Sequence, residues 1–139
     1  MFIFCFEYTK KCILRKGLPS LDIMTRIDLL FECGFSTKED YDDLCKIVAI
    51  FKDRCNIALT EENGGIMITH IAAAFKRNQS GEEISPLRDS VFEDVKDSPQ
   101  FALASELVEE IESQITNTIS EKERKFFFLH ICTVLTVCE

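Results

Sequence analysis

Apolar residues recur at helical spacing along most of this chain. Between residues 41 and 54, apolar side chains stand three or four positions apart, at Leu44, Ile47, Val48 and Phe51. Residues at this spacing lie on one face of an α-helix. No segment shows the strict alternation of apolar and polar residues that is typical of a half-buried strand. The pattern therefore predicts an all-α protein.

Three further segments follow the helical pattern. After Ser98 the apolar residues form one stripe, and the glutamates lie mainly outside it. Residues 126–137, which follow Ser120, are apolar nearly all round, and this predicts a central, buried helix. A shorter amphipathic pattern over residues 20–33 stops at Gly34, where a glycine is typical of a helix end.

Local signals predict where the helices begin and end. Residues 36–39 (STKE) and 120–123 (SEKE) fit the capping box, in which the serine side chain accepts a backbone N–H and the glutamate reaches back. At residues 85–86 and 98–99 a serine precedes a proline, which predicts a helix with that proline in its first position. The adjacent glycines at residues 64–65 are predicted to interrupt a helix.

These signals predict a compact bundle of five helices over residues 34–139. Residues 1–33 are then expected to form a short N-terminal helical extension. The length of 139 residues suits a single domain of this kind.

The charge is distributed unevenly along the chain. Residues 1–26 carry five basic and two acidic residues, a net +3, whereas the remainder carries 11 basic and 22 acidic residues, a net −11. An acidic body repels a phosphate backbone, so we expect no direct binding of nucleic acid. No apolar run approaches the ~20 residues of a membrane span, so we expect no membrane insertion.

The seven cysteines are odd in number and form no C-x-x-C pair. They lie within apolar helical patterns, which indicates reduced, buried thiols in a cytoplasmic protein. A zinc site needs thiolate or imidazole ligands clustered at short spacing, and the chain offers no such cluster. The sequence therefore predicts neither a metal site nor a cofactor.

Both histidines of the chain lie in apolar helical segments. Arg77 follows His70 by seven residues, and Glu123 precedes His130 by seven. Residues seven apart share a helix face and lie about 10 Å apart along the axis. A structural interpretation makes each histidine a hydrogen-bonded core residue. A functional interpretation makes it a nucleophile or a switch, because imidazole is partly neutral near pH 7 and a ring nitrogen can attack.

The segments around the histidines resemble a known family, the phosphotransferase-system regulation domain or PRD. ITHIAAAFKR at residues 68–77 is similar to the family's first histidine segment, and ERKFFFLHI at 123–131 to the second. Between them, ISPL at residues 84–87 is similar to the family's N-P-L segment, with serine in place of asparagine. The resemblance covers residues 34–139.

The resemblance implies a compact five-helix bundle, often dimeric, in which the two histidines lie near each other. It implies that His70 and His130 are phosphorylation sites, with Arg77 and Glu123 as supporting residues. Thr69 stands where many members have an aspartate directly before the first histidine, and it is a third candidate for a supporting role. The phosphoryl donors implied are the general phosphocarrier protein or a permease component of the phosphotransferase system.

The function expected from these features is that of a stand-alone, cytoplasmic regulatory module. It would respond to histidine phosphorylation and regulate transcription, as antiterminators of sugar operons do, through a homodimer or a protein partner. The alternative is a helical dimer or partner-binding protein that kept the fold and is not phosphorylated. An enzyme is not expected, because no acid, base or metal ligands converge in the sequence beyond the histidines.

Overall fold

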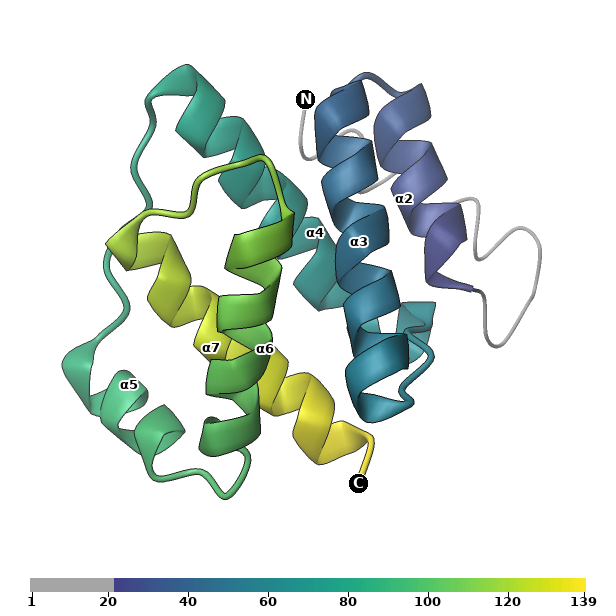
Figure 1. The fold of residues 1–139 in the computed structure, drawn as a ribbon. Helices are drawn as coiled ribbons and strands as arrows, with labels where there is room; N and C mark the ends of the chain where they lie inside the picture. Colours follow the sequence, from purple (N-terminus) through teal and green to yellow (C-terminus); the bar gives the residue numbers. More distant parts are fainter. Residues whose placement is uncertain (1–21) are drawn as a thin grey trace.

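The computed structural model describes residues 22–139, and within this range the protein is all-α. Six helices follow one another, and the described residues form no β-strand beyond an isolated bridge between Asp22 and Thr60. The helices are α2 (Ile23–Glu32), α3 (Lys38–Cys55), α4 (Glu61–Ser80), α5 (Asp89–Lys96), α6 (Phe101–Gln114) and α7 (Glu121–Val137) (Figure 1). The prediction of an all-α protein is confirmed.

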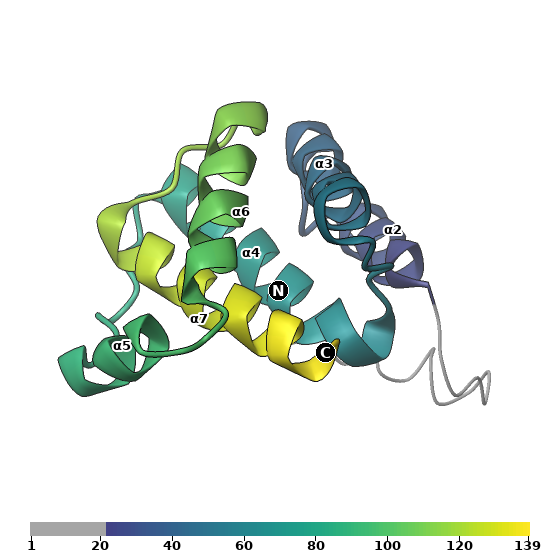
Figure 2. The same ribbon diagram turned by 60° about the horizontal axis from the view of Figure 1, so that its bottom comes forward.

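The helices pack around α4 and α7. Helices α2 and α3 lie side by side and both contact α4, while α6 packs against α3 and α7 (Figure 1). In the turned view α3 and α6 stand on one side of the pair formed by α4 and α7 (Figure 2). Helix α5 lies at the edge of the bundle, where it packs mainly against α7.

Helix α2 belongs to the same core as the other helices. Its side chains Ile23, Ile27 and Leu30 are almost fully buried among residues of α3 and α4. The prediction of five helices with a separate extension is therefore corrected: residues 22–139 form six packed helices, because the apolar face of α2 is covered by α3 and α4.

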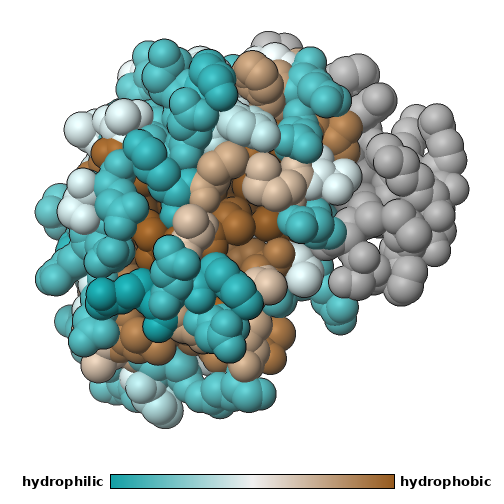
Figure 3. Space-filling model, turned by 45° about the vertical axis from the view of Figure 1, so that its right-hand side comes forward, coloured by the Kyte–Doolittle hydropathy of each residue, from teal (hydrophilic) through white to brown (hydrophobic). Residues whose placement is uncertain are grey.

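The core is drawn mostly from α3, α4, α6 and α7. Polar side chains cover most of the face in Figure 3, and apolar ones reach the surface in a central patch. The largest fully buried side chains include Leu44, Ile47, Phe51, Ile68, Ile71, Phe75, Leu107, Ile111 and Phe127.

The N-termini of α3 and α4 differ from the sequence predictions. The capping box of α3 pairs Thr37 with Asp40 instead of the predicted serine and glutamate, so the helix begins one residue later. Helix α4 begins at Glu61 and runs straight through the two glycines that were predicted to interrupt it. A second capping box, between Thr60 and Asn63, closes this start and offsets the low helix propensity of glycine.

The two serine–proline signals meet different outcomes. No helix begins at Pro86, because residues 82–88 form an irregular loop and α5 starts only after Arg88, without a side-chain cap. That prediction is wrong. Ser98 accepts the N–H of Gln100 at 3.2 Å. It is not the cap of α6, however, because the N-cap is Gln100, which has no side-chain cap, and the helix begins at Phe101 instead of Pro99.

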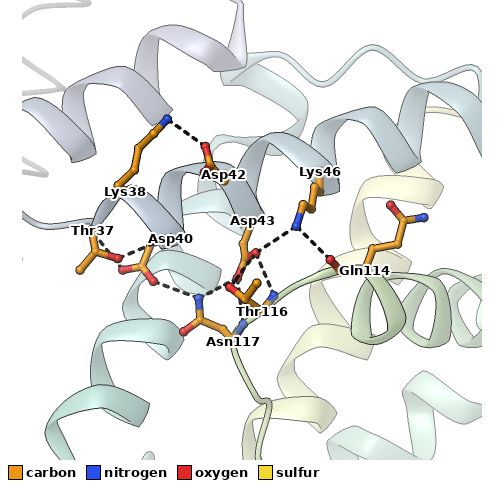
Figure 4. A network of polar contacts seen from close by, with 9 residues as sticks. All are labelled: Thr37, Lys38, Asp40, Asp42, Asp43, Lys46, Gln114, Thr116 and Asn117. Atoms are coloured by element: carbon orange, nitrogen blue, oxygen red, sulfur yellow. Dashed lines mark hydrogen bonds and ion pairs between the residues drawn. The ribbon is translucent and has the colours of Figure 1, made fainter.

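A buried carboxylate ties α3 to the loop between α6 and α7 (Figure 4). Asp43 is fully buried. It accepts the backbone N–H groups of Thr116 and Asn117, each at 2.9 Å, together with the Thr116 hydroxyl at 3.0 Å and the Asn117 amide at 2.8 Å. Burial alone would raise the pKa of Asp43, but these hydrogen bonds stabilise the anion and lower the pKa below its usual value.

Two expectations from composition can be compared with the structure. Cys45, Cys55, Cys132 and Cys138 are free thiols, as predicted, but of these only Cys132 is buried. The prediction of reduced thiols is wrong for Cys33, which is disulfide-bonded. Within residues 22–139, no helix is long and apolar enough to cross a membrane.

Candidate functional site

Helices α4 and α7 bring the two histidines into contact. The ring centroids of His70 and His130 lie 4.5 Å apart, and the ring planes are tilted by 32°. The residues are sixty positions apart in the chain, so only the packing of α4 against α7 brings them together. Each helix places its histidine on the side that meets the other helix.

An ion pair joins the same two helices beside the histidines. Arg77 donates from Nε to one carboxylate oxygen of Glu123 at 3.1 Å and from Nη2 to the other at 3.0 Å. Such a two-point pairing fixes orientation as well as distance. Since His70 faces His130 and Arg77 faces Glu123, α4 and α7 run antiparallel across this contact.

Glu123 explains why the capping box predicted at the start of α7 is only half formed. Ser120 accepts the N–H of Glu123 at 3.2 Å, as predicted. The carboxylate does not reach back to the N-cap, because it is buried and bound to Arg77. The glutamate thus connects helices instead of closing its own helix end.

The two histidines differ in their exposure. His70 is exposed, whereas His130 is half-buried. The Nε2 atom of His130 is enclosed and has no hydrogen-bond partner among the described residues. Beside the pair lies a cavity of about 10 Å³, which is lined by both histidines, Arg77, Glu123, Ile84 and neighbouring apolar residues.

Both imidazoles are shifted toward the neutral form. Partial desolvation of its ring and the nearby charge of Arg77 lower the pKa of His70, while Glu123 partly opposes them. Burial and the neighbouring His70 lower the pKa of His130 to about 4. Near pH 7 each ring therefore keeps a lone pair that can attack an electrophile or bind a proton.

We expect His130 to stay neutral across pH 5–8. Its folded pKa of about 4 lies below the unfolded value near 6.5, so the unfolded chain binds this proton first. The stability that depends on a neutral His130 ring is therefore fully present above about pH 6.5, and it is lost as the pH falls toward 4. Imidazole C–H resonances are recorded from pH 4 to 8 and assigned with His130→Gln, and their titration gives the pKa of His130. A pKa near 6.5 would contradict this prediction. In His70→Gln the midpoint should rise, because a competing cation is removed.

Thr69 does not join the histidine pair. Its buried hydroxyl accepts from Nη1 of Arg26 at 2.6 Å and donates to the Gly65 carbonyl at 2.9 Å. Arg26 also pairs with Glu61. Adjacent residues of a helix point about 100° apart, so residue 69 faces α2 while His70 faces α7. The structure therefore gives Thr69 the role of anchoring α4 to α2.

Sequence reasoning missed Ile84 as a neighbour of the site. The other residues that line the small cavity belong to α4 or α7, whereas Ile84 comes from the loop between α4 and α5. The available signal was an isolated apolar residue in a polar stretch, GEEISP. Among the described residues, no group of three or more histidine, cysteine, aspartate or glutamate side chains could hold a metal ion.

The fold and the site together define an all-helical domain built around a pair of facing, neutral histidines on antiparallel helices. This chain belongs to the PRD family, because the family model of the PRD domain matches residues 45–133, more than half of its length. The family is one of regulation modules linked to the phosphotransferase system.

The chain is also similar to "Uncharacterized protein YhfY" of Escherichia coli (strain K12). The two are 29% identical over 83 residues, which is 60% of this chain and 69% of that protein. No solved structure matches this chain significantly.

Proposed function

We propose that this protein is a regulatory module that changes state when a phosphoryl group is transferred to its histidine pair. The observation that carries the proposal is the contact between two neutral imidazoles, one of them exposed to an approaching donor. By family, the donor would be the phosphocarrier protein or a permease component of the phosphotransferase system, and the module would act on transcription in the cytoplasm. It would be a regulator and not an enzyme.

The transfer follows from the chemistry of the two rings. A lone pair on the neutral acceptor imidazole attacks the phosphorus of a phosphohistidine donor, and the new N–P bond forms as the old P–N bond breaks. The bonding electron pair returns to the donor ring, which takes up a proton. The acceptor ring loses the proton from its other nitrogen.

The added charge would disturb the ion pair beside the histidines. A phosphoryl group brings roughly two negative charges at neutral pH and three acceptor oxygens. Glu123 would be repelled and Arg77 would be drawn toward the new anion, although the two now bind each other. Because this ion pair links α4 to α7, a change of partner would alter the contact between the helices.

The output surface is proposed on the exposed side of α4. Ile66 lies one turn before His70 and is 71% exposed, so a large apolar side chain stands on the surface next to the exposed histidine. A homodimer or a protein partner that covers this face would sense the charge on His70 directly. The acidic surface argues against nucleic acid as that partner.

Phosphotransfer tests the proposal. The purified protein is mixed with phosphoenolpyruvate, the first enzyme of the phosphotransferase system, the phosphocarrier protein and permease components, and its intact mass is read at neutral pH. We expect an acid-labile gain of one phosphoryl group, which is lost in His70→Ala or His130→Ala. If every native donor fails while a control regulator is phosphorylated, the protein is the non-phosphorylated dimer or partner-binding module.

A further inference from the structure

The two histidines are not equally open to a donor. His70 is exposed, whereas Nε2 of His130 is enclosed and unpartnered. The cavity beside the rings holds about 10 Å³, near the lower limit of roughly 10–15 Å³ for a single water. A phosphoryl group with three oxygens cannot enter it as it stands.

One wall of this cavity can move without moving a helix. The remaining lining residues lie on α4 or α7, but Ile84 lies in the loop of residues 82–88. Most residues of this loop are exposed, while Ile84 and Leu87 are half-buried. An exposed ion pair between Glu83 and Lys122, at 3.1 Å, also links the loop to α7, and such pairs contribute little to stability.

The side chain of Ile84 also has space to move into. A second cavity, of about 380 Å³, lies beside the first and has Ala74, Arg77, Ile84 and Glu123 in its own lining. A shift of Ile84 toward this space would widen the small cavity on the side of the larger one. Nothing in the packing of α4 against α7 has to change for that movement.

We propose that Ile84 is a gate that determines which histidine accepts the phosphoryl group. This inference rests on the proposed function. With the gate closed, His70 accepts through its exposed ring. His130 accepts through Nε2 only when Ile84 has moved, by the same exchange of P–N bonds described above. The closed gate thereby directs a single phosphoryl group to the histidine on the exposed face of α4.

Access to His130 can be measured without any phosphoryl donor. Diethyl pyrocarbonate acylates neutral imidazole nitrogens, and peptide masses report its rate at each histidine. In a His70→Gln background, Ile84→Ala should raise the rate at His130 by about tenfold or more, because a minor open state is typically populated at about 10% or less. Leu87→Ala is the matched control, because it shortens a half-buried side chain of the same loop that does not line the cavity.

Phosphotransfer to the same variants then tests the gate separately from the proposed function. We expect phosphoryl transfer to His130 to rise with Ile84→Ala and not with Leu87→Ala, with the phosphoryl group on Nε2 by NMR. Equal acylation rates at His130 with and without Ile84 would overturn the gate. A faster acylation with Ile84→Ala but no phosphorylation of any variant would leave the gate on His130 in place and overturn the proposed function.

Discussion

Replacing Arg77 by methionine is expected to lower the free energy of unfolding by about 2–4 kcal/mol. The change leaves the carboxylate of Glu123 buried beside the histidines without its counter-charge and without the two hydrogen bonds that it now accepts. Removing one partner of a buried ion pair typically costs about 3–5 kcal/mol, and the partial exposure of Arg77 places this site toward the lower end. Urea denaturation at pH 7 measures the change.

Two further variants test whether the loss of stability in Arg77→Met comes from the unpaired charge of Glu123. Lys122→Met breaks the exposed pair with Glu83 and should change stability by less than about 1 kcal/mol. The double variant Arg77→Met with Glu123→Leu removes both charges and should recover much of the loss, because an apolar pair of similar size can replace a buried ion pair. A double variant as unstable as the single one would show that packing, and not charge, is responsible.

Replacing Asp43 by alanine is expected to have a comparable effect, of about 2–4 kcal/mol. The change leaves the backbone N–H groups of Thr116 and Asn117 and the Asn117 amide without the acceptor that they share. Each buried donor that loses its partner costs about 1–3 kcal/mol. Asp42→Ala is the matched control, because Asp42 is the exposed neighbour on the same helix and its loss should change stability by less than about 0.5 kcal/mol.

The effect of Asp43→Ala should depend on pH in a defined direction. The folded pKa of Asp43 is lower than the ordinary value, so the anion contributes stability above about pH 4. That contribution is lost as the pH falls through the folded pKa. The difference between the wild type and Asp43→Ala should therefore narrow below pH 4, and a difference that is constant down to pH 2 would contradict this origin.

The apolar spacing predicted those parts of the fold that depend on one helix at a time. Residues 41–54 and 126–137 lie in α3 and α7 as expected, because the 3.6-residue period decides which side chains share a face. The predictions failed where contacts between elements decide. A Cβ on Gly65 would lie 3.0 Å from the carboxylate of Glu61 and 3.2 Å from Nε of Arg26, so any larger residue inside α4 would push against that ion pair.

The candidate site was likewise predictable along each helix but not between helices. Spacing placed His70 with Arg77 on one face and His130 with Glu123 on another, and each pair does line the same cavity. Spacing could not show that the two faces meet, that Arg77 would bind Glu123, or that Thr69 would turn toward Arg26. These depend on how α4 crosses its neighbours, and periodicity along a single helix carries no information about that.

Helix α2 has a practical consequence for any attempt to isolate the domain. The family match covers residues 45–133, and a recombinant fragment cut near residue 34 would still contain it. Such a fragment would lack Ile23, Ile27 and Leu30 and would expose the core residues of α3 and α4 that they cover. Burial of each such side chain is worth about 1.5–3 kcal/mol, and the sum approaches the whole stability of a small domain. The family match is thus shorter than the packed core, which includes α2, and fragments should begin before Asp22.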